Sequence, residues 1–290
     1  MLVRFFLGIM WLIQCLPMSV LAPLGRGLGA LLYLVARERR HVTLTNLGLC
    51  FPQMSDAEKS ALARQHFAAF GRSFLDRGLM WWASETRLKR AIRIEGMEYL
   101  RAQKGKPTLL FSPHFMGLDM AGTRIMMEID CTSIYSVQKN KVFNDFLLKG
   151  RSRFGNSKHF SRQEGLRPPV RAMRQGLPFF YLSDLDYGPN EAIFVPFFAF
   201  NAATITGLSR LARMGNVTVM TVYGRMDDDG WTTIISPPWQ DFPGESVEAD
   251  TRRMNAELEA EMTKHPELLP QYLWMHKRFK TRPEGEKRVY

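Results

Sequence analysis

The chain has 290 residues and is 46% apolar, which supplies ample material for a buried core and excludes a disordered or fibrous protein. Its 39 basic and 28 acidic residues leave a formal charge of +11, which suits nucleic acid, an anionic membrane, a phosphorylated substrate or an acidic protein as partner. The three cysteines, Cys15, Cys50 and Cys131, show no CxxC spacing, so they favour a reducing compartment over a disulfide framework or a zinc site.

The N-terminal segment is apolar for 18 residues, from Phe5 to Ala22, apart from two polar side chains and a break at Pro17. That length is close to the roughly 20 residues that cross a bilayer. A basic residue, an apolar run and a small residue at position 22 also fit a cleaved signal peptide, which stays open as an alternative.

A second apolar stretch, LGALLYLVA, follows and ends in a basic cluster over residues 37–40, as in an anchor whose following domain faces the cytoplasm. We therefore predict an uncleaved, single-pass membrane anchor over residues 1–36 and one globular domain over residues 37–290. The hexapeptide GRGLGA within this region matches a dinucleotide fingerprint by letter, but no strand precedes it. Small residues that allow close helix packing explain it better.

A long helix is expected next, because Ser55 and Glu58 form a capping box and apolar residues then recur at helical spacing. At its end, Trp81 and Trp82 are either core residues or an aromatic pair at lipid headgroups.

From about residue 105, short apolar runs alternate with helical stretches, which indicates an α/β domain with a sheet flanked by helices. The runs are PTLLFS, CTSIYSV, LPFFYLS, AIFVPFF, VTVMTVY and WTTIIS. Helices are expected at TITGLSRLARMG and from about Val247 to Lys264, where Pro266 ends the second.

The stretch SPHFMGLDMAG contains the strongest candidate site, because His114 follows a strand and precedes a helix expected near Gly117. Sites gather at strand ends in open α/β sheets. Two residues five apart on one helix point about 140° apart, so His114 and Asp119 can meet only if His114 lies on the loop and Gly117 permits the turn. Asp119 would then hold the Nδ1 proton and leave Nε2 to accept a proton from a hydroxyl. The alternative is a histidine that merely caps a strand end.

The motif HFMGLD resembles the H-x-x-x-x-D/E motif of glycerolipid acyltransferases. The chain as a whole resembles the late, or secondary, acyltransferases of lipid A biosynthesis, of the lauroyl/myristoyl transferase type. The resemblance rests on NLGLCFPQMS, SPHFMGLDMAG, YSVQKNKVFNDFLLKGRSRFG, YLSDLDYGPNEAIFVPFFAFNAATITGLSRLARMGN and QYLWMHKRFKTRPEGE.

This resemblance implies a glycerolipid-acyltransferase-like mixed sheet behind a single-pass anchor in the bacterial inner membrane, with the catalytic domain on the cytoplasmic side. The implied reaction moves a fatty acyl chain from acyl carrier protein to the 3-hydroxyl of a primary acyl chain on a Kdo-linked lipid A precursor. Acyl carrier protein and the anionic glycolipid would be its partners, and no cofactor is implied.

Carried over by position, the resemblance makes His114 the base and Asp119 its partner, and it places Arg151 and Asp184 among the functional residues. The substrate-binding candidates are Arg151, Asp184, their neighbours Arg153 and Asp186, and Lys139. Leu185, between the two aspartates, departs from the Gln or His that the family often has there.

A basic stretch from Lys139 to Arg162 has seven basic residues against Asp145 alone, so we expect a site for phosphorylated headgroups or acidic carrier protein rather than a merely solvated face. Lys139 is its first member. A second group, Lys277, Arg278, Lys280 and Arg282, would serve the same end or meet anionic lipid. Tyr272 and Trp274 nearby are expected in the core.

Other classes remain as alternatives. A same-scaffold acyltransferase could use another glycolipid or a glycerophosphate, and a protein without activity could simply bind anionic lipid. Nucleic-acid binding has only the charge in its favour, and His and carboxylate residues show no metal-ligand spacing. An acyl-enzyme on Ser112, two residues before His114, is the alternative to direct transfer, which we favour.

Overall fold

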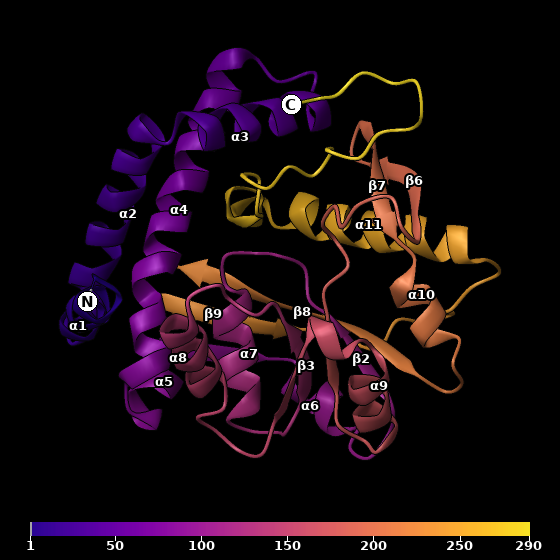
Figure 1. The fold of residues 1–290 in the computed structure, drawn as a ribbon, viewed down its shortest axis with the longest axis horizontal. Coiled ribbons are helices and arrows are strands. Elements are labelled where there is room, and N and C mark those ends of the chain that lie inside the picture. The colour runs from indigo at the N-terminus through magenta and orange to yellow at the C-terminus, as the bar shows by residue number, and fades with distance from the viewer. Residues whose placement is uncertain (1) are drawn as a thin grey trace.

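A seven-stranded mixed sheet positions the site (Figure 1). The computed structural model describes residues 2–290. The strand order is β1-β9-β8-β2-β5-β3-β4. All neighbours run parallel except β8 and β9, which pair antiparallel. The strands are β1 Ile92–Glu95, β2 Thr108–Phe111, β3 Thr132–Tyr135, β4 Lys158–Ser161, β5 Phe179–Tyr181, β8 Thr218–Asp227 and β9 Gly230–Ile235. A separate antiparallel hairpin is formed by β6 Ala192–Phe197 and β7 Phe200–Ile205.

Helices cover both faces of the sheet, which explains why its strands read as continuous apolar runs. Leu109 and Phe111 pack with side chains of α9 (Arg167–Arg174), α10 (Gly207–Ala212) and α11 (Val247–Lys264). Leu110, which points to the opposite face, packs with α6 (Met97–Arg101) and α7 (Leu118–Met126). The α/β class with a mixed sheet flanked by helices is therefore confirmed.

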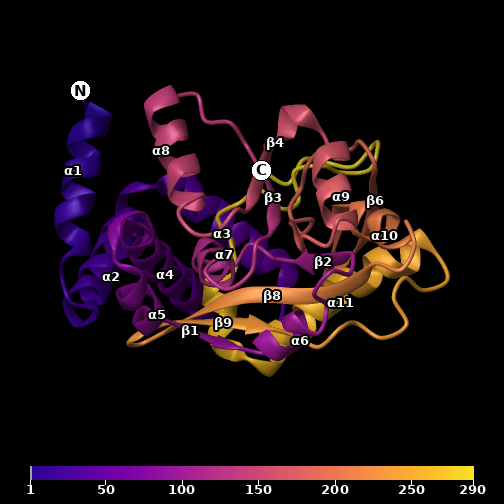
Figure 2. The same ribbon diagram turned by 90° about the horizontal axis from the view of Figure 1, so that it is seen from below.

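Five helices precede the sheet, in the order α1 Leu2–Gln14, α2 Met18–Val35, α3 Arg37–Cys50, α4 Asp56–Trp82 and α5 Glu85–Ala91. The long α4 begins at Ser55 with the predicted capping box, in which the Glu58 backbone N–H donates to the serine hydroxyl. By length and composition, α2 could cross a membrane. It runs along α4, and α1 and α2 lie at the edge of the molecule (Figures 1 and 2).

Glycines bring α2 and α4 together. A Cβ on Gly25 would overlap the backbone of Arg72, and one on Gly29 would overlap the backbone of Phe67. Gly71 of α4 faces both glycines in the same way. Small residues at such spacing let helix backbones approach closely. This confirms that the small residues of GRGLGA allow close helix packing.

The outer surface of α1 and α2 is largely apolar, with Arg26 as an exposed charged residue. Its exposed large apolar side chains are Phe5, Ile9, Trp11, Leu12, Val20, Leu24, Leu31, Leu34 and Val35. Proteins in water rarely expose a contiguous apolar patch of this kind. This surface therefore indicates association with a membrane.

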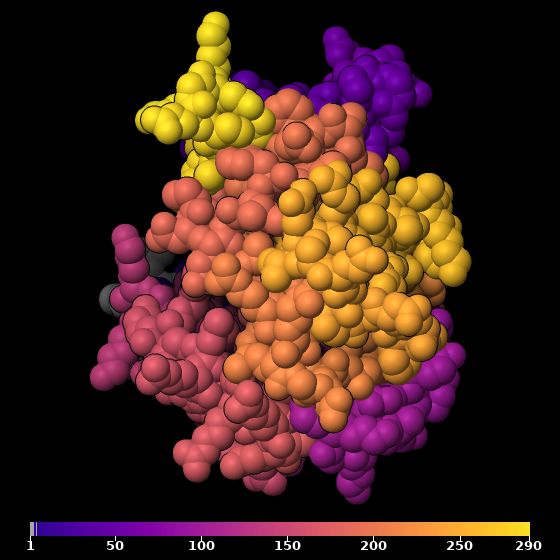
Figure 3. All heavy atoms as spheres, turned by 90° about the vertical axis from the view of Figure 1, so that its right-hand side faces the viewer, coloured from indigo at the N-terminus to yellow at the C-terminus, as the bar shows by residue number. Residues whose placement is uncertain are grey.

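Most of the remaining predicted elements are present, and α11 has the predicted bounds. The edge strands β1 and β4 were missed because they are four residues long and at least half polar. Strand β7 includes Thr204 and Ile205, which we had placed in a helix. Tyr272 and Trp274 are buried, as predicted. In Figure 3, the golden segment that includes α11 forms the right-hand part of the face, beside the pink to orange segments that precede it in the chain, and the yellow C-terminal segment lies at the upper left.

Candidate functional site

His114 and Asp184 meet because they follow neighbouring parallel strands at the same distance. In the pairing of β2 with β5, Leu109 lies opposite Phe179 and Phe111 opposite Tyr181. Continuing this register by three residues brings His114 opposite Asp184, at the carboxyl ends of two central strands. This is the edge at which sites form in open α/β sheets.

The carboxylate of Asp184 holds His114 through two hydrogen bonds. The Nδ1–H donates to Oδ1 at 2.7 Å, and the backbone N–H of His114 donates to Oδ2 at 2.8 Å. Asp184 is 1% exposed at its side chain, and His114 is 19% exposed. Burial alone would raise the pKa of Asp184, but the charge and hydrogen bonds of His114 outweigh it and lower that pKa below its ordinary value.

The predicted partnership of His114 with Asp119 is wrong. Asp119 lies in the first turn of α7, as expected, but its Oδ1 accepts a hydrogen bond from Arg151 Nη2 at 3.1 Å and its Oδ2 lies 3.8 Å from Arg77. The pairing of β2 with β5 brings the carboxylate of Asp184 next to Nδ1 of His114, so Asp119 pairs with the arginines instead. Asp184, which we predicted to bind substrate, takes the orienting position instead.

Asp119, Arg151 and Arg77 form a charged group beside His114. Each of the three side chains is about one third exposed. Burial raises the pKa of Asp119, but the two arginines outweigh this and hold the pKa below its ordinary value. Asp119 is therefore ionised at neutral pH and fixes the direction of the Arg151 guanidinium.

The C-terminal segment fixes the backbone of the His114 loop. The His114 carbonyl accepts from the Leu273 N–H at 3.0 Å, and the Met116 N–H donates to the Gln271 carbonyl at 2.8 Å. Gly117 was expected to permit an unusual turn, but its φ is −87°, which any residue adopts. A glycine is required there because a Cβ would overlap the carbonyl oxygen of Gly224 on β8.

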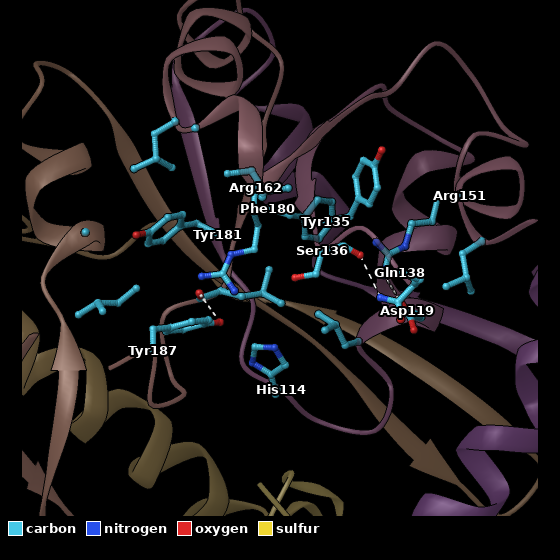
Figure 4. Close-up of a pocket in the computed structure, with 18 of the residues that line it drawn as sticks. His114, Asp119, Tyr135, Ser136, Gln138, Arg151, Arg162, Phe180, Tyr181 and Tyr187 are labelled. Carbon is cyan, nitrogen blue, oxygen red and sulfur yellow. Dashed lines mark hydrogen bonds and ion pairs between the residues drawn. The ribbon is translucent and has the colours of Figure 1, made fainter. Parts of the chain in front are cut away.

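A cavity of about 730 Å³ opens above His114 (Figure 4). His114 lies at its base, Asp119 and Arg151 lie together on one side, and Arg162 reaches into the space above the imidazole. Its polar wall residues are His114, Asp119, Tyr135, Ser136, Gln138, Asn144, Arg151, Arg162, Tyr181, Tyr187, Asn190 and Glu191. Within the described residues, the Nε2 of His114 has no hydrogen-bond partner, so it is free to act on a molecule in this cavity.

Three residues predicted to bind substrate do not line this cavity. The Arg153 guanidinium donates to the carbonyls of Met80 and Ala83, so it joins the chain after α8 (Lys141–Arg151) to the end of α4. Asp186 accepts from the Thr281 N–H at 2.6 Å and from the Thr281 hydroxyl, so it holds the C-terminal segment. Lys139 is exposed on the surface before α8.

The C-terminal basic group is also largely structural. Arg278 is 1% exposed and donates to the Ala203 carbonyl at 2.7 Å, and Lys277 pairs with Glu38 at 3.0 Å. The expectation that this group forms an anion site is wrong for Arg278, because its guanidinium is buried and its two terminal nitrogens donate to Ala203 and Thr204 inside the protein.

Sequence reasoning missed several residues of the site. Arg162 lay in the basic stretch without being singled out, and its guanidinium stacks on Tyr187, 5.2 Å from the ring centroid. Tyr187 directly follows Asp186, and this position beside the predicted site residues is the one feature of the sequence that could have identified it. Arg77 gave no signal, because it lies in α4 far from the motif in sequence.

Ser112 is not placed to act as a nucleophile. It is fully buried, does not line the cavity, and its hydroxyl donates to the Val222 carbonyl at 3.0 Å. No group of three or more metal-ligating side chains occurs among residues 2–290. A histidine oriented by a buried carboxylate, with its second nitrogen open to a large cavity, is the arrangement of an enzyme that uses general base catalysis.

Comparison with known proteins places this site in a family. The family model described as bacterial lipid A biosynthesis acyltransferase matches residues 1–281. The chain is 33% identical over 285 residues to a lipid A biosynthesis lauroyltransferase of Escherichia coli strain K12, covering 96% of this chain and 91% of that protein. It is 32% identical over 291 residues to a lipid A biosynthesis palmitoleoyltransferase of the same organism, covering 99% and 93%.

Among solved structures, a 1-acyl-sn-glycerophosphate acyltransferase from Thermotoga maritima aligns with a TM-score of 0.41 at 15% identity, covering 85% of this chain and 97% of that one. The family match and the two relatives agree over nearly the whole chain. The chain belongs to the bacterial lipid A biosynthesis acyltransferases, and it is an acyltransferase.

Proposed function

We propose that the protein transfers a fatty acyl chain from acyl carrier protein to the 3-hydroxyl of a primary acyl chain on a Kdo-linked lipid A precursor, which forms an acyloxyacyl group. The observation that carries the proposal is the 2.7 Å hydrogen bond between His114 Nδ1 and Asp184, which directs Nε2 into the cavity. Membership of the family supports an acceptor in the lipid A pathway.

In the proposed reaction, Nε2 of His114 removes the proton of the acceptor hydroxyl as its oxygen attacks the thioester carbonyl carbon. The new C–O bond forms, the C–S bond then breaks, and the proton passes from Nε2 to the departing thiolate. Asp184 stabilises the imidazolium that exists between these two proton transfers. Direct transfer requires no enzyme nucleophile, in agreement with the buried hydroxyl of Ser112.

Arg151 has the charge and position to stabilise the oxyanion that develops on the thioester carbonyl. Its guanidinium lines the cavity together with His114, and Asp119 holds it at 3.1 Å. Donors fixed before the reaction are worth far more than donors that must reorient. In this proposal the motif carboxylate acts through Arg151 and not through His114.

Two further features suit the anionic substrates. Arg162 lies in the cavity wall with its guanidinium stacked on Tyr187, where a phosphate would find a bidentate donor. The exposed lysines of α8 and its flanks, Lys139, Lys141 and Lys149, lie on the surface beside the cavity and suit the acidic carrier protein.

The proposed reaction is tested by mass spectrometry of tetra-acylated Kdo-lipid A precursor after incubation with the protein and a mixed-length pool of acyl carrier protein thioesters. We expect one added acyl mass from the wild type and, because the base is removed, at least about a 10³-fold lower rate from His114→Ala. His41→Ala is the matched control, since His41 is exposed on α3 and does not line the cavity.

Two results would contradict this proposal. No added mass from folded wild-type protein in detergent would exclude the lipid A acceptor, and glycerophosphate or another glycolipid would then be tried with the same donors. Full activity of His114→Ala would exclude the histidine mechanism while leaving the reaction in place.

We also propose that residues 1–36 hold the enzyme at the inner membrane and that residues 37–290 form its catalytic part on the cytoplasmic side. The apolar outer surface of α1 and α2 would face lipid, and the basic cluster at 37–40 would meet the cytoplasmic headgroups. In the single-pass arrangement, α2 would cross the bilayer and the turn between α1 and α2 would lie on the periplasmic side. In the structure this turn lies against α5, where Arg87 donates to the Leu16 carbonyl at 2.6 Å, so the arrangement needs a direct test.

Cys15 offers a natural probe of this topology. It is exposed in that turn, whereas Cys50 and Cys131 are buried. A single pass predicts that an impermeant maleimide labels Cys15 in intact spheroplasts, and Cys15→Ser provides the background. Labelling that occurs only after the membrane is permeabilised would contradict the single pass and place α1 and α2 together in the cytoplasmic leaflet.

A further inference from the structure

A second, smaller cavity branches from the first beside the reaction centre. It has a volume of about 300 Å³ and shares Leu118, Asp119 and Arg151 with the main cavity. Most of its own wall is apolar, and Arg77, Thr123 and Ser133 are its polar members. The apolar residues beyond the shared ones are Met80, Trp81, Gly122, Met126, Phe143 and Gly150. The main cavity is larger, and Arg162, Tyr187 and Asn190 line it but not the branch, so it can take the polar part of a substrate.

Helix α7 lines the small cavity from its mouth to its end. Asp119, Gly122, Thr123 and Met126 all line it and lie at i, i+3, i+4 and i+7, which places them on one face of the helix. The rise of 1.5 Å per residue sets Asp119 and Met126 about 10 Å apart along the axis. The cavity therefore runs from the Asp119–Arg151 pair, beside His114, down the side of α7.

The opposite wall is fixed in place. The indole of Trp81 packs edge-on against Phe146 with ring centroids 5.1 Å apart, and a Cβ on Gly150 of α8 would come within 2.7 Å of its Cδ1. In contrast, a Cβ on Gly122 would have Met126 Cε at 3.5 Å as its nearest neighbour, an ordinary contact with the flexible end of a side chain. Position 122 can therefore accept a larger side chain, which would project into the cavity.

We infer that this branch binds the fatty chain of the acyl donor, that Gly122 keeps it open, and that Met126 closes its far end and so limits the chain length. The inference rests on the proposed function and adds a specificity determinant to it. The stretch of α7 that lines the branch, about 10 Å from Asp119 to Met126, would then set how much of the fatty chain the branch can hold.

Donor selectivity tests this inference. The donors are acyl carrier protein thioesters of eight to sixteen carbon atoms, supplied one at a time with one fixed lipid A precursor. Gly122→Leu fills the middle of the branch, so the ratio of kcat/KM for the twelve-carbon donor over the eight-carbon donor falls by about tenfold or more, since one methylene in an apolar pocket is worth at least that factor. Met126→Ala shifts the optimum toward longer chains.

Gly122→Ala and Gly48→Leu are the matched controls. The first adds only a methyl group, and its shift is smaller than that of Gly122→Leu. The second places leucine on α3, where a Cβ at Gly48 meets nothing within 4 Å and no cavity is lined, so its donor profile matches the wild type. Replacing glycine in a helix removes its entropic penalty, so Gly122→Leu remains folded, which thermal unfolding checks.

Each remaining outcome separates this inference from the function it rests on. An unchanged donor profile in active Gly122→Leu and Met126→Ala would overturn the inference and leave the reaction standing. An unchanged donor profile with a raised KM for the lipid acceptor would assign the branch to a chain of the acceptor and would also overturn it. No acyl transfer by the wild type would instead remove the proposed function.

Discussion

We expect Asp184→Asn to lower the kcat of acyl transfer by about 10³-fold to 10⁴-fold, as in other enzymes whose catalytic histidine loses its orienting carboxylate. Asp184 accepts two hydrogen bonds from His114, one from Nδ1 and one from the backbone N–H. An asparagine offers only one oxygen, so its amide nitrogen must face one of these donors. The imidazole then turns or takes the tautomer whose Nε2 carries the proton and cannot act as a base.

Asp186→Asn is the matched control for this substitution. Asp186 is two residues away and nearly as buried, but it binds Thr281 and Gly188, not the histidine. We expect Asp186→Asn to lower the midpoint of thermal unfolding and to leave kcat within about tenfold of the wild type. Steady-state kinetics of both variants, normalised to folded protein, would contradict the assignment if the two lost equal activity or if Asp184→Asn retained it.

The meeting of His114 and Asp184 was within reach of the sequence, but the pairing of two strands had to be known. PTLLFSPH and LPFFYLSD each place the functional residue three positions after the strand, at the same register. Sequence spacing favoured Asp119 because it considers only residues that are close along the chain. In the structure, the parallel pairing of β2 with β5 instead brings His114 next to Asp184, 70 positions away.

Other parts of the site show why residue type alone does not determine role. Arg153 and Asp186 share the charge of Arg151 and Asp184, and the sequence offers no reason to separate them. Their partners separate them: Arg153 binds the end of α4 and Asp186 binds Thr281. By contrast, the strands with strong apolar runs, the capping box of α4 and the close packing of GRGLGA follow from local patterns, and all were predicted.

The second large effect is expected at Gly117, where one added methyl group should destabilise the fold and remove activity together. A Cβ there would overlap the carbonyl oxygen of Gly224, and a Cβ on Gly224 would overlap the carbonyl oxygen of Gly117. Both backbones are held, Gly117 at the start of α7 and Gly224 in the pairing of β8 with β9. Because neither can yield as a side chain can, we expect Gly117→Ala to cost about 3 kcal/mol of unfolding free energy.

Thermal or urea unfolding measures this cost, and Gly48→Ala is the control. A Cβ at Gly48 in α3 meets nothing within 4 Å, so that variant is expected to be as stable as the wild type or slightly more stable, as usual for alanine in place of a helical glycine. The Gly117→Ala protein that stays folded should also be less active, because His114 lies only three residues before the displaced position. Normal stability together with normal activity would show that the backbones at Gly117 and Gly224 do not need this close contact. The position of the His114 loop would then have to depend on its hydrogen bonds to Asp184, Gln271 and Leu273 alone.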